Sequence, residues 1–329
     1  VFRSPSASTS FYSLLPVVFH IIMSSPSSSS IPLVDFSLTD DEVRAQVEHA
    51  LRNFGFMYLS NSGAGEEIAA LRAASQGFFS LAEESKEKTK ARSLPEIPLR
   101  GYYGERELNT YKAFGRNGPP DYCSQFFMGD EGTGNRFPSD EYETLVSAVY
   151  QRFSAIGLRL LTLVLEAYKL DRAWVDREFL KSPTMTAFKV LHYPQPTERE
   201  CVDATKQNEA NNNKERDGDQ LRMAAHFDVD ALTVLYQDPK VKGGLQINLD
   251  DGKGWQDAQA PEGALVVNVG ELLKFMSNGE IRCTEHRVRM PTVDERANSD
   301  RVSIALFLNP RADTLIRPHQ DSQIKDETN

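Results

Sequence analysis

The second half of the chain is dominated by strand-like runs, and this feature constrains the fold more than any other. Strand patterns prevail from Thr186 onward: 245–249 alternates polar and apolar residues, and 264–269 is a run of the buried type. On a strand spanning 301–308, one face carries Arg301, Ser303, Ala305 and Phe307, and the other carries Val302, Ile304, Leu306 and Leu308. These patterns predict a β-rich core in this part of the chain.

Two histidines and one aspartate within this region have the residue types of a metal site. His226 and Asp228 are two positions apart, so on a strand both side chains point to the same face, and the β-prone run 231–236 follows them. His286 lies in another strand-like run, 58 positions beyond Asp228, so only the tertiary structure can bring it to the other two. Two histidines and a carboxylate form the facial triad of non-haem Fe(II) oxygenases, which leaves one face of the metal open.

The alternative readings of these residues are weaker. A single histidine in a strand is usually a packed or surface residue, so the prediction rests on all three residues together. A structural zinc site is disfavoured because such sites usually have four ligands rich in cysteine. The other candidates, His20, His49 and His319, lie in flanking segments or in a predicted helix and are not expected to be ligands.

Arg301 and Ser303 are predicted to bind a carboxylate. Their spacing places both on one face of a strand. The planar guanidinium of an arginine matches the two oxygens of a carboxylate, which a lysine cannot reproduce, and the serine hydroxyl adds a donor. Alone, Arg301 could instead form a salt bridge.

At these residues the chain resembles the 2-oxoglutarate/Fe(II)-dependent oxygenases of the isopenicillin N synthase-like family. The resemblance extends, in the expected order, to segments 31–36, 54–63, 78–81, 100–102, 192–194 and 244–246, and covers roughly residues 31 to 311. It implies an α+β fold in which helices brace a double-stranded β-helix, a relative of the jelly roll. The implied organisation is an N-terminal non-haem dioxygenase region at 31–178, the Fe(II)/2-oxoglutarate dioxygenase domain at 179–312 and a polar tail at 313–329.

The same resemblance implies the activity and the site. His226, Asp228 and His286 would bind Fe(II), and Arg301 and Ser303 would bind the distal carboxylate of 2-oxoglutarate, with Tyr193 as a further candidate for co-substrate binding. O2 would be the other co-substrate. The expected reaction hydroxylates, desaturates or cyclises a small organic molecule, as in secondary metabolism, with release of succinate and CO2. The metal and co-substrates supply the chemistry, and the protein orients them in a shielded pocket.

The chain departs from the family pattern at three positions outside the metal triad. Ser62 stands where a histidine is common, Leu191 where an asparagine is common, and Lys189 where an arginine is common. These departures bear on co-substrate binding and leave the metal ligands intact. Two alternatives therefore stay open: an Fe(II) oxidase of the same fold that needs no 2-oxoglutarate, and a non-catalytic binding protein.

Helical patterns are confined mostly to the first half. Thr39 can cap a helix with Glu42 completing a capping box, a second helix is expected near 66–79, and Ser139 begins the longest helix. The charged stretch 84–92 is predicted to be a solvated turn. The irregular stretch 100–135 is expected to line the site. Tyr102, Tyr103 and Tyr111 are candidates, although packing or hydrogen bonding elsewhere is favoured for any one of them. The polar insertion 197–222 has no period and is predicted to be a mobile surface loop.

Composition fits a soluble enzyme. The net charge of -10 and a pI near 5.2 argue against nucleic acid as a partner, because nucleic-acid binding demands a basic surface. Cys123, Cys201 and Cys283 are few and far apart, which favours free thiols in a reducing compartment and hence a cytoplasmic protein. No membrane partner is predicted, and a monomer is expected.

The first thirty residues differ from the rest of the chain. They combine a short apolar stretch, 11–23, with a Ser/Pro-rich run. The stretch is too short to span a membrane comfortably, although it could imitate a signal peptide. Segment 1–30 is predicted to be a disordered leader, either sequence upstream of a natural start at Met23 or a targeting extension.

Overall fold

The strand-like runs of the second half form strands that alternate between two sheets. The computed structural model describes residues 31–319 except 182, 212–215, 217 and 242. Strands β5 (Ala187–Tyr193), β7 (Leu232–Gln237), β10 (Leu265–Val269) and β12 (Arg301–Leu308) belong to a large sheet. Between them in the sequence, β6 (Met223–His226), β8 (Leu245–Asn248), β9 (Trp255–Asp257) and β11 (His286–Val288) form a small sheet. This alternation confirms the predicted α+β fold with a jelly-roll core.

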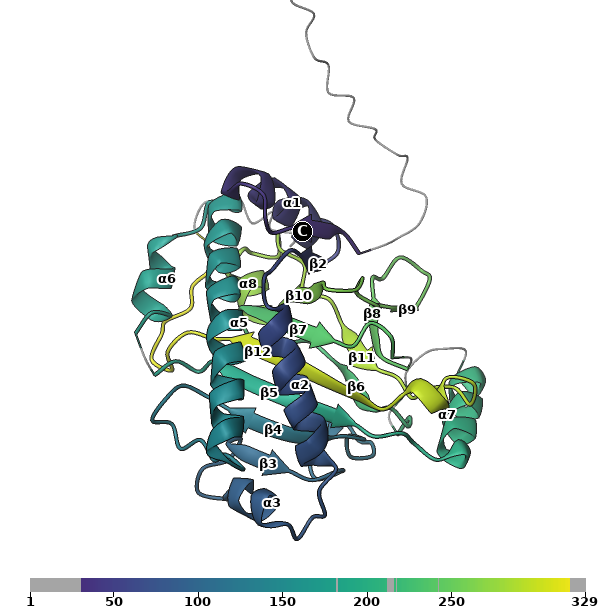
Figure 1. The fold of residues 1–329 in the computed structure, drawn as a ribbon. Helices are drawn as coiled ribbons and strands as arrows, with labels where there is room; N and C mark the ends of the chain where they lie inside the picture. Colours follow the sequence, from purple (N-terminus) through teal and green to yellow (C-terminus); the bar gives the residue numbers. More distant parts are fainter. Residues whose placement is uncertain (1–30, 182, 212–215, 217, 242, 320–329) are drawn as a thin grey trace, which may run out of the picture. The chain divides into compact units, whose positions relative to one another are not determined.

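The N-terminal half widens the large sheet at both of its edges (Figure 1). Its strands are β1 (Leu33–Asp35), β2 (Phe56–Ser60), β3 (Gly101–Tyr103) and β4 (Ser124–Met128). The eight strands follow the order β1-β2-β10-β7-β12-β5-β4-β3, and the small sheet follows β6-β11-β8-β9. Strand β12 therefore lies in the interior of the large sheet, paired with β5 on one side and β7 on the other.

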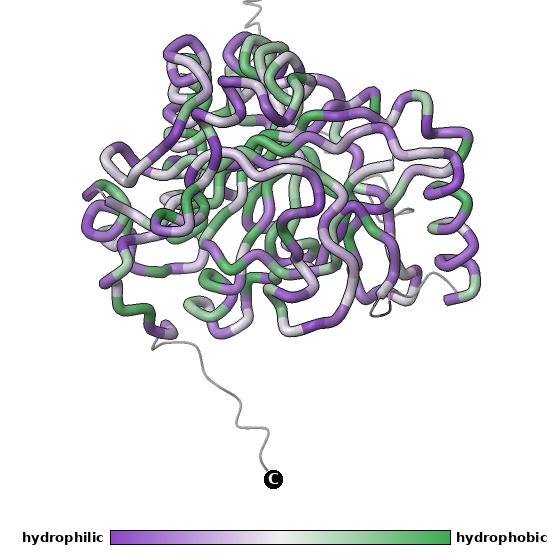
Figure 2. The backbone as a smooth tube through the Cα atoms, turned by 90° about the horizontal axis from the view of Figure 1, so that it is seen from below, coloured by the Kyte–Doolittle hydropathy of each residue, from purple (hydrophilic) through white to green (hydrophobic). Residues whose placement is uncertain are grey.

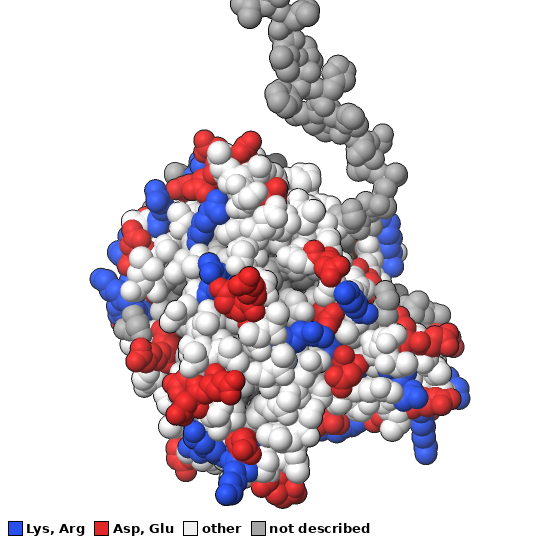
Figure 3. All heavy atoms as spheres, viewed as in Figure 1, with Lys and Arg blue, Asp and Glu red and all other residues white. Residues whose placement is uncertain are grey.

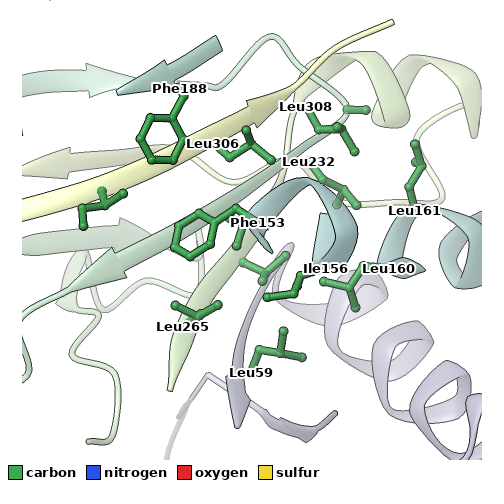
Figure 4. Packing of buried hydrophobic residues seen from close by; sticks show 14 of the residues in the cluster. Leu59, Phe153, Ile156, Leu160, Leu161, Phe188, Leu232, Leu265, Leu306 and Leu308 are labelled. Atoms are coloured by element: carbon green, nitrogen blue, oxygen red, sulfur yellow. The ribbon is translucent and has the colours of Figure 1, made fainter. Parts of the chain in front are cut away.

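The longest helix, α5 (Asp140–Ala167), covers one face of the large sheet. Ser139 caps it by accepting a hydrogen bond from the backbone N–H of Tyr142, as the sequence predicted. Its buried residues Phe153, Ile156 and Leu160 pack in the same cluster as Leu306 and Leu308 of β12 (Figure 4). Each such side chain contributes roughly 1.5–3 kcal/mol through burial. The helix is also long and apolar enough to cross a membrane, but it packs here as the core helix of a sheet.

The amino-terminal helices confirm two predictions from the sequence and correct a third. The capping box of Thr39 and Glu42 is present at the start of α1 (Asp40–Asn53), and α2 (Gly65–Phe79) matches its predicted range to within one residue. The predicted turn at 84–92 is wrong: it contains α3 (Lys86–Ala91), capped by Ser85. Its residue Lys88 is buried because its ammonium donates to the carbonyl of Phe79 and pairs with Glu83, so its charge did not signal exposure.

The polar insertion 197–222 is not simply a loop, which corrects the sequence prediction. It begins with α7 (Glu198–Ala210), whose capping box joins Thr197 and Glu200. Only Cys201 and Ala204 of this helix are buried, so its apolar face is too narrow to give a visible period. Four short helical segments complete the described fold: α4 (Thr110–Ala113), α6 (Ala173–Glu178), α8 (Glu271–Met276) and a 3-10 turn at Arg296–Asn298.

Charged residues are spread over the outside of the described fold, among exposed apolar side chains. Figure 2 shows hydrophobic stretches in the interior strands and helices and hydrophilic stretches in the peripheral turns. Acidic and basic side chains are interspersed on the face shown in Figure 3. The chain from Ile31 forms one compact unit. The division near residue 178 stays a prediction, and the predicted leader 1–30 lies outside the described residues.

Candidate metal centre

The small sheet brings the three predicted metal ligands together. His226, the last residue of β6, pairs directly with His286, the first residue of β11. The Nε2 atoms of His226 and His286 lie 3.8 and 3.7 Å from Oδ1 of Asp228, and one ligand atom from each of the three side chains lies within 4.8 Å of the others. One detail of the prediction is wrong: Asp228 does not continue the strand, because β6 ends at His226.

Backbone carbonyls set the tautomers of both histidines. Nδ1 of His226 lies 2.8 Å from the carbonyl oxygen of Ala224, and Nδ1 of His286 lies 3.3 Å from that of Thr284. A carbonyl can only accept, so Nδ1 of each ring carries the proton and donates, and the Nε2 lone pair faces Asp228. Burial lowers the pKa of His226 to about 4, with a further contribution from His286, so this ring is neutral and able to bind a metal at pH 7.

The aspartate is oriented by two polar residues that the sequence analysis missed. Oδ2 of Asp228 accepts hydrogen bonds from the Thr233 hydroxyl at 2.5 Å and from the Asn268 amide at 2.7 Å. Its other oxygen, Oδ1, is left to face the histidines. Both residues interrupt apolar strands, Thr233 in β7 and Asn268 in β10, and are nearly fully buried. A polar residue inside a buried strand needs a partner, and this was the available signal.

A second buried carboxyl group completes this network. The Thr233 hydroxyl also lies 2.8 Å from Oδ2 of Asp230. The hydroxyl has one proton, so it cannot donate to both carboxyl groups. Burial, and then the charge of Asp228, raise the pKa of Asp230 well above its ordinary value. A proton on Asp230 would satisfy both contacts, because Asp230 would then donate to the Thr233 hydroxyl while that hydroxyl donates to Asp228.

The predicted carboxylate clamp lies beside Tyr193 on the large sheet. Arg301 pairs with Tyr193 across β12 and β5, and its Nη2 donates to the Ser303 hydroxyl at 2.6 Å. Its guanidinium carbon lies 4.8 Å from the centre of the Tyr193 ring. Its Nε is buried without a hydrogen-bond partner, and no carboxylate of the described residues forms an ion pair with it. A buried cation with unused donors is suited to an anionic ligand.

Arg222, which the sequence analysis did not single out, adds a second buried cation beside Tyr193. It is 0% exposed, and its guanidinium carbon lies 5.8 Å from the centre of the Tyr193 ring. Among the described residues, its hydrogen-bond acceptors are the carbonyls of Gly243, Ser299 and Pro194. Burial and the repulsion of Arg301 lower the pKa of Arg222 to about 10, so it remains charged at pH 7. Arg222 directly precedes the apolar strand β6, and this position was the sequence signal that could have indicated its burial.

A cavity of about 440 Å³ opens next to the metal ligands. His226, Asp228 and Asp230 line it, together with residues of β4, β5 and β12. The predicted contribution of stretch 100–135 is confirmed through other residues, since its lining members are Arg100, Leu108, Asn109, Thr110, Ala113, Phe114, Asp121, Gln125 and Phe127. The three candidate tyrosines do not line it, and each is hydrogen-bonded elsewhere, which was the favoured alternative. Tyr102 bonds to Glu83, Tyr103 to Ser93, and Tyr111 to the carbonyl of Asp219.

Comparisons with known proteins agree with this geometry. Residues 190–310 match the 2OG-Fe(II) oxygenase superfamily, and residues 31–146 match the N-terminal family described as non-haem dioxygenase in morphine synthesis. The chain belongs to the 2-oxoglutarate/Fe(II)-dependent oxygenases of the isopenicillin N synthase-like type, and is an oxidoreductase with Fe(II) and 2-oxoglutarate as its cofactor and co-substrate.

Two relatives and one solved structure show the extent of the similarity. Deacetoxycephalosporin C synthase of Amycolatopsis lactamdurans is 25% identical over 295 residues, which cover 87% of this chain and 86% of the relative. A bifunctional coumaroyl CoA and feruloyl CoA ortho-hydroxylase of Ruta graveolens is 27% identical over 298 residues, which cover 88% of this chain and 72% of the relative. The crystal structure of a full-length Neurospora crassa protein in complex with alpha-KG and thymine is 25% identical, covers 88% of each chain and has a TM-score of 0.70.

Proposed function

We propose that His226, Asp228 and His286 hold the Fe(II) of this oxygenase and that the protein oxidises a small organic molecule. The observation that carries the proposal is the meeting of two imidazoles and one oriented carboxylate within 4.8 Å. The donor set is the one that non-haem Fe(II) uses. When bound, Fe(II) and 2-oxoglutarate supply the oxidising chemistry, in which O2 is consumed and the keto acid becomes succinate and CO2.

The residues of the large sheet are proposed to bind 2-oxoglutarate. Arg301 offers its guanidinium and Ser303 its hydroxyl to the distal carboxylate, and the buried charge of Arg222 adds attraction for the dianion. Tyr193 is proposed to assist by its ring, which both guanidinium groups approach, and by its hydroxyl. Burial raises the pKa of Tyr193, so the hydroxyl stays neutral and can donate to an anion.

The reaction is proposed to be a hydroxylation, desaturation or cyclisation within secondary metabolism. Support comes from the relatives, which are named a coumaroyl CoA and feruloyl CoA ortho-hydroxylase and a deacetoxycephalosporin C synthase. The cavity beside His226 has apolar walls and a few convergent polar groups, as small-molecule sites do.

The first test is an anaerobic titration of the Fe(II)-loaded protein with 2-oxoglutarate. We expect the weak visible charge-transfer band of a chelated keto acid to appear and saturate. Chelator-treated protein, lacking Fe(II), is the matched control and should give no band. Absence of the band with Fe(II) verifiably bound would contradict the co-substrate assignment, and failure to bind Fe(II) would contradict the metal site. Quantifying succinate against oxidised product then separates this activity from an oxidase that needs no 2-oxoglutarate.

We further propose that the protein acts as a monomer in the cytoplasm. The supporting observation is that Cys123, Cys201 and Cys283 are all buried and free. Light scattering after size-exclusion chromatography tests the first part, with a dimer mass as the contrary result. Imaging of a fluorescent fusion placed after Asn329 tests the second, with an organellar pattern as the contrary result.

A further inference from the structure

The described cavity contains a cation that the metal and co-substrate assignments leave unused. Lys189 lies on β5 and lines the cavity that His226 and Asp228 also line. Among the described residues, its ammonium has no hydrogen-bond or ion-pair partner. Two aromatic rings lie beside it: Nζ is 5.1 Å from the centre of the Phe127 ring and 4.6 Å from that of Phe307. The rings hold the charge in place without neutralising it.

The register of the large sheet separates this cation from the clamp proposed for 2-oxoglutarate. Tyr193 pairs with Arg301, whereas Lys189 pairs with Ala305 on the same face of the two strands. Four residues of strand place the two levels about 13 Å apart. The 2-oxoglutarate carboxylate that pairs with Arg301 is therefore at a different level, and Lys189 is available to another molecule.

The nearby carboxyl groups do not satisfy Lys189. Asp121 lines the same cavity, but its two oxygens accept from the backbone N–H and the hydroxyl of Thr110 at 3.0 and 2.9 Å. Asp228 faces the histidines, and Oδ2 of Asp230 lies against the Thr233 hydroxyl. These groups lie too far from Lys189 for an ion pair. Burial lowers the pKa of Lys189 and the surrounding acidic groups oppose that change, so a bound anion would stabilise the charged ammonium further.

The mouth of the cavity is apolar. Met185, Val229 and Phe114 are 59%, 68% and 44% exposed and line the cavity together with the half-exposed Phe227. A ligand that fits both the Lys189 ammonium and the apolar mouth has an anionic group and an apolar body. Resting on the function proposed above, we infer that the oxidised substrate is a hydrophobic carboxylic acid whose carboxylate pairs with Lys189.

The inference is tested by comparing acids with their uncharged amides. Isothermal titration would measure the binding of phenylacetate, hydrocinnamate and octanoate, each beside its primary amide, to protein saturated with Mn(II) and 2-oxoglutarate. Mn(II) replaces Fe(II) so that binding is measured without turnover, and saturating 2-oxoglutarate protects the Arg301 site. At least one acid should bind about tenfold or more tightly than its amide, a preference worth about 1.4 kcal/mol.

Variants of the lysine show where the preference originates. Lys189→Met keeps the length of the side chain and should abolish the preference for the acid, whereas Lys189→Arg should retain most of it. Lys112→Met, which removes an exposed charge from the adjacent helix α4, is the control and should behave as the wild type. Affinity for 2-oxoglutarate, measured in the same variants, should be unchanged and shows that they are folded.

Three results would overturn the inference. One is equal affinity for every acid and its amide, including no measurable binding of either, which would leave Lys189 as a donor to an uncharged group or a purely structural residue. Another is a preference for the acid that survives in Lys189→Met. The third is displacement of 2-oxoglutarate by the acids in proportion to their affinity. If the wild type fails to bind 2-oxoglutarate at all, the proposed function fails first, which the initial saturation step reveals separately.

Discussion

The two faces of strand β12 (Arg301–Leu308) meet opposite environments. Val302, Ile304 and Leu306 belong to the main hydrophobic cluster, which also contains the buried residues of α5. Arg301 and Ser303 point the other way, toward Tyr193 and the buried cation Arg222. Successive side chains of a strand point to opposite faces of the sheet. Residues of β12 that pack in the core therefore alternate with residues that face the proposed co-substrate site.

This difference shows how the fold keeps a charged site rigid. The apolar face fixes the strand by packing, so the position of Arg301 does not depend on the ligand that it would bind. The polar face retains unused hydrogen-bond donors, such as Nε of Arg301, which destabilise the empty protein and favour the loaded one. We therefore expect substitutions on the apolar face to change stability and substitutions on the polar face to change ligand binding.

The largest expected effect falls on the metal ligands. Asp228→Ala removes the only charged member of the triad and leaves Thr233 and Asn268 without their acceptor. We expect Fe(II) binding and turnover to be lost, as measured by metal analysis after gel filtration and by succinate formation. Asp203→Ala, at an exposed position of α7, is the control and should bind one equivalent of Fe(II). Retention of that stoichiometry by Asp228→Ala would refute the assignment.

The next effect belongs to the apolar face. Ile304→Ala leaves a cavity beneath α5 and should lower the free energy of unfolding by about 2–5 kcal/mol, with the affinity for 2-oxoglutarate unchanged. Denaturant unfolding and the anaerobic titration measure the two quantities. Ser303→Ala, one residue away on the polar face, is the matched comparison. It should weaken 2-oxoglutarate binding and leave the free energy of unfolding nearly unchanged. If Ile304→Ala weakened 2-oxoglutarate binding more than it destabilised the fold, the separation of the two faces would be wrong.

The parts of this molecule that the sequence predicted are those in which pattern and environment agree. The two faces of β12, the capping box of α1 and the long helix after Ser139 all follow from local periodicity or capping. Helix α7 was missed although Thr197 and Glu200 carry the same capping signature, because its buried face comprises only Cys201 and Ala204. A helix that buries so little of its surface needs no apolar period, so the lack of one does not exclude it.

The site was predictable in its ligands and not in their surroundings. His226, Asp228 and His286 form a pattern that the chemistry of a metal constrains. The partners of Asp228 come from β7 and β10, and only the fold determines which polar residues of distant strands meet. Arg222 and Lys189 were overlooked in their present roles for the same reason: their significance lies in the partners that they lack, which no sequence window displays.

A smaller effect is expected from Arg301→Lys. The ammonium of lysine keeps the charge but loses the planar pair of donors, so 2-oxoglutarate binding should weaken by about tenfold, or about 1.4 kcal/mol. The concentration of 2-oxoglutarate at half-saturation of the charge-transfer band measures this change, and Fe(II) binding should be unaffected. Arg199→Lys, at a position 90% exposed on α7, is the control. Unchanged affinity for 2-oxoglutarate in Arg301→Lys would show that the clamp lies elsewhere.

The smallest effect tests how closely the backbone fits around the guanidinium. A Cβ atom added at Gly244 would lie 2.6 Å from Nη1 of Arg301, too close for an undisturbed contact. In Gly244→Ala the guanidinium must therefore shift away from β8, and 2-oxoglutarate binding should weaken by less than the about tenfold expected for Arg301→Lys. Gly77→Ala, where an added Cβ meets nothing within 4 Å, is the control and should leave that affinity unchanged. The double variant Gly244→Ala/Arg301→Lys should bind no more weakly than Arg301→Lys alone if Gly244 acts only by positioning Arg301, because the two substitutions then disturb one interaction. Additive losses in free energy would instead show that Gly244 affects the co-substrate through a separate contact.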